Sequence, residues 1–393
     1  MDPRFVDFRL ELPELSFDSP LTDVVMGLEQ LRHLALRGDT PIPIFYQLKN
    51  IFQLLESLGS ARIEGNHTTL ADYIEVKIED GNSKDEGVLE IQNIERALEY
   101  IEQTIKPEEI ITETFIRELH ALAVKDLVRE GDKTPGQYRV GNVKIKGSTH
   151  LPPDHLAVSS YMQELVDFIN RDDARKYDLL KIALAHHRFS WVHPFSNGNG
   201  RVNRLLSYAL LIKEGFNVRV GGRVLNPTAV FCINRDLYYS KLNAADQGEP
   251  AALQDWSLYV LSGIEAELEK VDQLTKYDYL KKEVLYPALA HSKQRQLVND
   301  AEHDILHLAI ELGQLKSDDI AKKYPDMTPR MRSYLIKKLV DSKLIKPIKQ
   351  GSRIYTINFI NNSLLRSVVK SLEEKGFIPS FIKSPDNQPA SPA

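Results

Sequence analysis

Apolar residues recur three and four positions apart along most of this chain, the spacing that predicts amphipathic α-helices. The clearest stripes are Ile51, Leu54, Leu55 and Leu58, and Val202, Leu205, Leu206, Ala209 and Ile212. Further helices are expected within 16–39, 88–130, 156–169 and 179–186, with a break in the second segment at Lys106-Pro107. Strand-like alternation is confined to short runs. The pattern therefore predicts a mainly α protein.

The region 295–378 has a different order of elements. Three helices and two β-like runs are predicted, at 305–312, 317–323, 328–341, 344–348 and 353–359. Thr328 as N-cap and Pro329 at the first helical position mark the start of the third helix. A turn at 350–352 separates the two β-like runs. This order resembles a winged helix.

Composition sets the broad class of the protein. The 393 residues suffice for two or three domains of roughly 100 to 200 residues each. A net charge of −5 gives no global attraction to nucleic acid or membranes. The single Cys232 excludes an internal disulfide and a cysteine cluster for metal. Met1–Arg4 does not begin an apolar signal segment, and no apolar run approaches the ~20 residues that span a bilayer. The protein is therefore expected to be cytoplasmic, with no membrane partner.

The order of the predicted elements and the changes in composition along the chain predict three domains and a tail. A helical N-terminal region is expected over 1–110, a core over 111–275 and a winged-helix domain over 295–378. Residues 379–393 are rich in Pro, Ser and Asn, a composition typical of disorder.

The densest chemistry lies in the stretch 193–204, which reads HPFSNGNGRVNR. A helix that starts here offers unpaired N–H groups and a positive dipole end, which attract phosphate. The glycines at 198 and 200 let the backbone approach an anion. Arg201 and Arg204, three positions apart, lie on one side of that helix, and forked guanidiniums suit phosphate. The stretch therefore predicts a polyphosphate site.

This stretch resembles the signature of the Fic (filamentation induced by cAMP) family, His-Pro-Phe-x-Asp/Glu-Gly-Asn-Gly-Arg-x-x-Arg. The resemblance implies a Fic-type helical bundle with a β-hairpin flap. It also implies transfer of AMP from ATP to Ser, Thr or Tyr hydroxyls of proteins, the chain itself included. Relatives that transfer UMP, phosphocholine or phosphate leave other donors open, although the Gly-Asn-Gly-Arg pattern and Glu64 favour AMP.

The resemblance also assigns roles to individual residues. His193, with an ordinary pKa near roughly 6.5, would accept the proton of the attacking hydroxyl. ATP would be held by the loop and the two arginines, that is Gly198, Asn199, Gly200, Arg201 and Arg204. Asn197 stands where the family usually has an Asp or Glu that helps to bind Mg²⁺. An amide oxygen can still coordinate Mg²⁺ but supplies no charge, so weaker metal binding and slower transfer are expected.

Three segments resemble the flap of the family: Pro135–Arg139, Val143–Ser148 and Pro152-Pro153. Alternation over 142–146 predicts an extended edge, which could pair with a target peptide through main-chain hydrogen bonds. An ordinary surface hairpin is the other interpretation. The flap residues placed at the nucleotide are Val143, Lys144, Ile145 and Lys146.

A pair of tyrosines resembles a family segment that lines the base pocket. Tyr238 and Tyr239 could stack on adenine, as aromatic rings do with flat bases. A tyrosine pair in a helix is also typical of core packing, so both interpretations stay open.

The segment 60–66 resembles the inhibitory motif of Fic proteins, Ser/Thr-x-x-x-Glu-Gly/Asn. Ser60 and Glu64 lie one turn apart on the helix that starts before Ile51 and is expected to end at Gly65. In the family this glutamate pairs with the second arginine of the signature, Arg204 here, and so displaces the γ-phosphate. The alternative is a solvated glutamate at a helix end.

The winged-helix region is basic within an acidic chain. Residues 316–353 hold eleven Lys or Arg against four Asp, a local net charge of +7. Arg330, Arg332 and Lys337 on the recognition helix and Arg353 on the wing suit DNA backbone contacts. A protein-docking module is the other interpretation. An alternative function is therefore a DNA-binding regulator with a nucleotide-sensing, weakly active Fic core. The sequence leaves a homodimer open and does not name the protein target.

Overall fold

The computed structural model describes residues 4–33, 38–79, 83–216, 230–231, 234–379 and 382. Cys232 and nearly all of the predicted tail lie outside these residues. Contacts divide the chain into two compact units. Unit 1 is drawn from 1–35, 56–68 and 84–269, and unit 2 from 36–55, 69–83 and 270–393. Neither unit contains, within the described residues, a helix long and apolar enough to cross a membrane.

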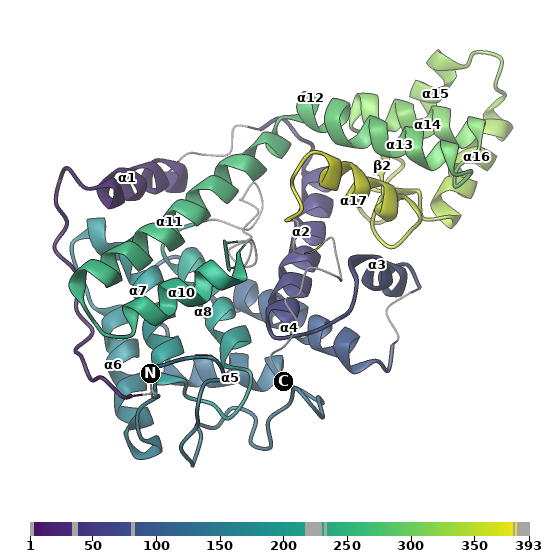
Figure 1. The fold of residues 1–393 in the computed structure, drawn as a ribbon. Helices are drawn as coiled ribbons and strands as arrows, with labels where there is room; N and C mark the ends of the chain where they lie inside the picture. The colour runs from purple at the N-terminus through teal and green to yellow at the C-terminus, as the bar shows by residue number, and fades with distance from the viewer. Residues whose placement is uncertain are drawn as a thin grey trace. The chain divides into compact units, whose positions relative to one another are not determined.

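Unit 1 is helical (Figure 1). Within the described residues, the α-helices that lie wholly in this unit are α1 (Pro20–His33), α4 (Glu86–Thr104), α5 (Glu113–Ala123), α6 (Val158–Asn170), α7 (Asp178–Val192), α8 (Asn199–Lys213) and α10 (Arg235–Ala245). Helix α2 (Ile42–Ile63) gives its residues from Glu56 onward to this unit, and α11 (Pro250–Asp272) gives those up to Glu269.

Helix α8 lies at the centre of unit 1, in contact with α4, α5 and α7. Its predicted stripe is confirmed, because all five of its apolar members are buried. The helix is buried on its other sides as well, and Arg201 and Arg204 are only 1% and 2% exposed. A helix enclosed in this way holds its first turn rigidly, and the candidate site is built on that turn.

Residues 193–197 form the loop between α7 and α8, and Gly198 is the N-cap of α8. Helix α7 ends at Val192, and its C-cap residue His193 lies in the left-handed region, with φ 49° and ψ 61°. Gly198 caps α8 with φ 75°, a conformation that glycine adopts without strain. Between them Phe195 is buried and stacks on the imidazole of His120, with ring centroids 3.8 Å apart.

The predicted β-hairpin flap is extended but is not a hairpin. Residues 142–145 run extended, turn at Gly147 with φ 78°, and form no strand ladder with the returning arm. The returning arm pairs with the N-terminal segment instead: Arg4 N donates to Thr149 O and Leu151 N donates to Arg4 O, both at 3.0 Å. Within the described residues, Ile145 O accepts a turn bond from Ser148 N at 3.2 Å, and residues 142–144 keep an unpaired main-chain edge.

Unit 2 contains the elements predicted for a winged helix (Figure 1). They are α14 (Asp300–Leu312), α15 (Ser317–Lys323), α16 (Pro329–Asp341), β1 (Ile345–Pro347) and β2 (Tyr355–Ile357). The strands pair antiparallel, and Leu315 bridges to Tyr355 as a third arm. Unit 2 also contains the α-helices α3 (Leu70–Ile78), α12 (Tyr277–Leu280), α13 (Tyr286–Gln294) and α17 (Leu364–Glu374).

The unit boundaries differ from the predicted 1–110, 111–275 and 295–378. Residues 1–110 are shared between the two units: 36–55 and 69–83 belong to unit 2, and the others to unit 1. Within unit 2, Gln47 Nε2 donates to Ile357 O at 2.9 Å, and Gln47 Oε1 accepts from Phe359 N at 2.9 Å. Within unit 1, α4 packs on α8 and α5. Such long-range contacts leave no mark on local composition.

Candidate functional site

The first turn of α8 is held by an amide clip. Asn199 Oδ1 accepts from Phe195 N at 2.9 Å, and Asn199 Nδ2 donates to Phe195 O at 2.8 Å. Both polar atoms of the Asn199 side chain are therefore engaged with the loop backbone. Asn199 was predicted to contact phosphate; in this structure it fixes the loop that presents the N–H groups.

His193 lies where α7 meets this loop. Arg139 Nε donates to His193 O at 2.9 Å, and the same guanidinium donates to Pro153 O at 2.6 Å and to Gly141 O at 3.0 Å. Arg139 thus ties both ends of the flap to the loop. Burial and the Arg139 charge lower the pKa of His193 to about 4, so its imidazole is neutral at pH 7 and can accept a proton.

Arg204 is bound through Nε and Nη2 to the end of helix α2. Its Nε donates to Ser60 Oγ at 2.8 Å, and its Nη2 donates to Ser60 O at 2.9 Å and Glu64 Oε1 at 2.7 Å. Burial alone would raise the pKa of Glu64, but the Arg204 and Arg201 guanidiniums outweigh it, so this pKa is lowered overall. Glu64 is therefore ionised at neutral pH, and the predicted pairing of Ser60, Glu64 and Arg204 is what the structure contains.

Glu64 also covers the helix start directly. A Cβ on Gly200 would lie 2.1 Å from Glu64 Oε1 and 3.1 Å from Arg204 Nη1. The absence of a side chain at 200 lets a carboxylate approach the backbone of the first turn. The place suited to an anion at the N-terminus of α8 is thus taken by the chain's own carboxylate.

Arg201 has partners that the sequence did not suggest. Its Nη1 lies 2.9 Å from Glu90 Oε1, and its Nη2 donates to Glu130 O at 2.8 Å. Asn66 Nδ2 donates to the other oxygen of Glu90 at 2.7 Å. Burial raises the pKa of Glu90 in spite of Arg201. The only local signal for Glu90 was an acid among the apolar positions of its helix.

Residues 110–211 match the model of the Fic/DOC family. The chain carries a Fic domain. The matched residues include the loop 193–204 and the flap but stop short of Tyr238, and they begin after Glu64.

Curated relatives are named protein adenylyltransferase Fic. The relative from Aedes aegypti is 32% identical over 198 residues, which are 48% of this chain and 36% of that protein. The relative from Nematostella vectensis is 28% identical over 245 residues, 61% of this chain and 51% of that protein. The chain thus spans about half or less of the length of these curated relatives.

Solved structures agree on the fold. A Fic family protein from Desulfovibrio desulfuricans G20 has a TM-score of 0.54 at 18% identity, over 88% of this chain and 98% of that one. Fic-1 from C. elegans has a TM-score of 0.50 at 22% identity, over 64% of this chain and 70% of that one. The predicted mainly α, Fic-type fold is confirmed.

A buried histidine missing from the sequence prediction supports the loop of the Fic domain. His120 Nδ1 accepts from Gly136 N at 2.9 Å, which leaves Nε2 as the donor to Asn197 O at 3.1 Å. Burial lowers the pKa of His120 to about 4, which keeps the neutral tautomer that both bonds require. His120 therefore joins the start of the flap to the signature loop.

The sequence predicted a metal ligand at Asn197. Within the described ranges no group of three or more His, Cys, Asp or Glu side chains could hold one. The predicted ligand Asn197 has both side-chain polar atoms engaged: Oδ1 accepts from Gly198 N at 2.7 Å, and Nδ2 donates to Gly131 O at 3.2 Å. The Mg²⁺ role of Asn197 therefore has no support in its geometry.

The two tyrosines differ in exposure. Tyr238 is buried, bonds His186 Nε2 through its hydroxyl at 2.9 Å, and packs against Phe231 and Trp256. Tyr239 is 41% exposed. Tyr238 thus matches the core interpretation, and Tyr239 is the more exposed of the two, with the Arg235 guanidinium 5.5 Å from its ring centroid.

The flap presents two kinds of side chain. Val143 and Ile145 are half-buried, and Lys144 and Lys146 are exposed. A cavity of about 340 Å³ lies beside the flap, lined mainly by apolar groups: Phe5, Asn142, Val143, Leu151, Pro152, Pro153, Asp154, Ala157 and Tyr161. The alternation predicted from sequence is present even though the hairpin is not.

Unit 2 places the predicted DNA contacts unequally. Arg330, Lys337 and Arg353 are exposed. Arg332 is partly buried, and its Nη1 donates to Met327 O at 2.5 Å. Arg332 therefore serves the turn before α16 in this structure, and the exposed cations are the other three.

Proposed function

We propose that this chain is a protein adenylyltransferase that transfers AMP from ATP to a Ser, Thr or Tyr hydroxyl, including its own. The observation that carries the proposal is the Glu64 carboxylate held between Gly200 and Arg204 at the start of α8. A carboxylate there marks an anion site. A neutral His193 on the same loop supplies the base that transfer to a hydroxyl requires.

The reaction balances with the groups present. The hydroxyl oxygen of the target forms a bond to the α-phosphorus of ATP, and the bond from that phosphorus to the β-phosphate bridging oxygen breaks. Pyrophosphate leaves, and the hydroxyl proton passes to a ring nitrogen of His193. The hydrogen bond from the ring to the Ser190 backbone orients the imidazole for this transfer.

The loop and arginines would bind the phosphates. N–H groups of the first turn of α8 face the anion, and Gly200 permits close approach. Arg204 would hold the γ-phosphate once Glu64 leaves it. Arg201 Nε has no hydrogen-bond partner within the described residues and is available to the β-phosphate. Mg²⁺ carried by ATP would neutralise charge on the departing pyrophosphate.

The flap would hold the acceptor. Residues 142–144 make no main-chain hydrogen bond within the described residues, and a target segment can join this edge as an added strand. Arg139 connects this edge to His193, so that the bound hydroxyl and the base are placed together. Tyr239 would stack on the adenine.

The test is intact-mass analysis of the purified chain after incubation with ATP, UTP or CDP-choline in the presence of Mg²⁺. The proposal expects a gain of one AMP from ATP, stronger in Glu64→Gly, and no gain from the other donors. Transfer of UMP or phosphocholine in preference to AMP would assign a different donor.

A second function is supported by the surface of α16. Arg330, Ser333, Tyr334 and Lys337 are exposed at helical spacing, and Arg353 is exposed on the wing. We infer that this face binds the DNA backbone. A gel shift with duplex DNA at low salt tests it, and no binding there would favour protein docking. Cytoplasmic location and a homodimer remain predictions of the sequence.

A further inference from the structure

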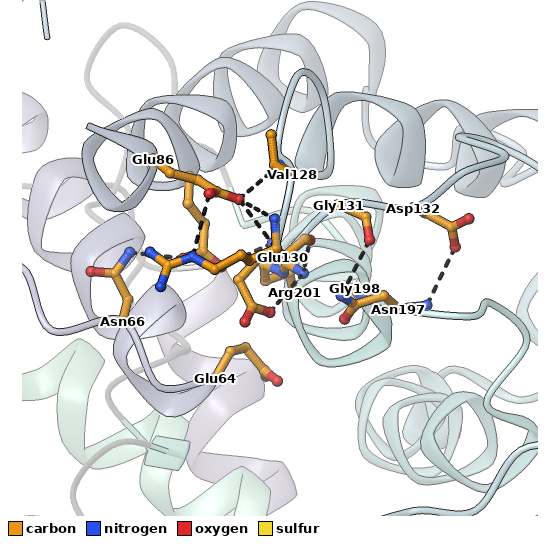
Figure 2. Close-up of polar contacts among 12 residues, drawn as sticks. Glu64, Asn66, Glu86, Val128, Glu130, Gly131, Asp132, Asn197, Gly198 and Arg201 are labelled. Carbon is orange, nitrogen blue, oxygen red and sulfur yellow. Dashed lines mark hydrogen bonds and ion pairs between the residues drawn. The ribbon is translucent and has the colours of Figure 1, made fainter. Parts of the chain in front are cut away.

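The amide of Asn197 makes two opposite hydrogen bonds. Its Oδ1 accepts from Gly198 N at 2.7 Å, and its Nδ2 donates to Gly131 O at 3.2 Å (Figure 2). Only a group that both accepts and donates satisfies this pair of partners, which a carboxylate does not do. The residue that departs from the family signature thus matches its surroundings.

The carbonyl that meets Asn197 is fixed in place. Glu86 Oε1 accepts from three successive backbone N–H groups, Val128 at 2.7 Å, Arg129 at 2.6 Å and Glu130 at 3.3 Å (Figure 2). A Cβ on Gly131 would lie 2.0 Å from Leu127 O, so the turn requires glycine there. The turn 127–132 is therefore a rigid bracket, and it cannot rotate the Gly131 carbonyl away.

The bracket touches the signature loop at further points. Asn197 N donates to Asp132 Oδ2 at 3.3 Å, and Arg201 Nη2 donates to Glu130 O at 2.8 Å. The charged or titratable groups that face position 197 are therefore Asp132, His120, Glu130 and Arg201, of which Asp132 is the nearest carboxylate. A second carboxylate at 197 would meet both the Gly131 carbonyl and the Asp132 charge.

We propose that Asn197 is a positioning residue, whose amide clips the phosphate-binding loop to the bracket 127–132, and that a carboxylate cannot replace it. That the loop binds ATP rests on the proposed function, whereas the hydrogen bonds of the Asn197 amide do not depend on it. An acid at this position holds metal in the family signature, and here that role is exchanged for a hydrogen bond. The Asn197 departure is then an adaptation of the loop rather than a loss of activity.

The rank order of variants separates the two roles. In a Glu64→Gly background, the clip predicts that kcat for self-modification falls in the order Asn197, Asn197→Ala, Asn197→Asp. Loss of a partly buried donor corresponds to roughly tenfold in kcat, and the added charge increases the loss. The Mg²⁺ concentration that gives half the maximal rate should stay unchanged. A metal-ligand role predicts the reverse order, with Asn197→Asp faster and saturated at lower Mg²⁺, and that result would overturn the proposal.

A second measurement, hydrogen exchange, requires neither Mg²⁺ nor AMP transfer. Hydrogen exchange of the 198–201 amides in the metal-free chain should accelerate in both variants, with the melting temperature little changed. Ser196→Asp, which adds the same charge on an exposed neighbouring side chain, serves as the control and should leave exchange unchanged. Unaltered exchange in Asn197→Asp would refute the clip. If no variant transfers AMP while exchange follows the predicted order, the proposed function fails and the clip stands.

Discussion

Glu64 Oε1 lies 2.7 Å from Arg204 Nη2 and directly above Gly200 at the start of α8. One carboxylate therefore satisfies the second arginine of the signature and fills the space against the helix N-terminus. ATP needs the same arginine and the same space for its terminal phosphates. Activity and inhibition thus compete for a single anion site, and displacement of Glu64 is the step that permits transfer.

Removal of the base tests its assignment. His193→Ala should reduce AMP transfer below detection, because no other group at the loop accepts the hydroxyl proton. ATP affinity should remain within about threefold, since His193 acts on the acceptor and not on the phosphates. Radiolabelled transfer and equilibrium binding in the Glu64→Gly background measure the two quantities. Near-normal transfer would remove His193 from the mechanism.

The pH dependence follows from the same residue. Burial and Arg139 lower the pKa of His193 from 6.5 to about 4, so the base form persists well below neutral pH. The value of kcat/KM reports the ionisation of the free enzyme. It should therefore stay constant through pH 6.5 and decrease only as the pH approaches 4. A decrease of kcat/KM to half its maximum at pH 6.5 would mean that the base is not in the environment described.

Ser60 contributes a separate part of the inhibited state. Ser60→Ala removes the 2.8 Å bond to Arg204 Nε but keeps the Glu64 pair, so self-modification should rise by about tenfold, less than in Glu64→Gly. Ser57→Ala is the matched control: Ser57 is a buried serine of the same helix, and its hydroxyl has no hydrogen-bond partner within the described residues. Equal effects of the two changes would point to helix packing rather than to the Arg204 contact.

The parts of the site that could be predicted are those written in local sequence. The glycines, the two arginines and the Ser60–Glu64 spacing lie in short motifs, and the apolar stripe of α8 follows from its period. The partners of these groups could not be predicted, because Glu90 and Glu130 reach Arg201 only through tertiary packing. The flap hairpin was wrong for a similar reason: Arg4, more than a hundred residues away, takes the main-chain bonds.

DNA binding by the surface of α16 can be tested through its dependence on salt concentration. Arg330→Ala with Lys337→Ala should weaken DNA binding and reduce the slope of log K against log salt by about two, one unit for each phosphate contact. Lys282→Ala with Lys375→Ala removes the same charge at exposed lysines outside α16 and the wing, and should leave the slope unchanged. Equal slopes for both double variants would place the DNA contact elsewhere.

The competition between Glu64 and ATP is tested most directly by the rate of self-modification, measured by intact mass in wild type, Glu64→Gly, Arg204→Ala and the double variant. Glu64→Gly should be faster than wild type by about a hundredfold, at the upper range of coupling between two sites. Arg204→Ala should be inactive alone and in the double variant, because relief acts through that arginine. Equal AMP transfer by wild type and Glu64→Gly would contradict the account and leave Glu64 without an inhibitory role.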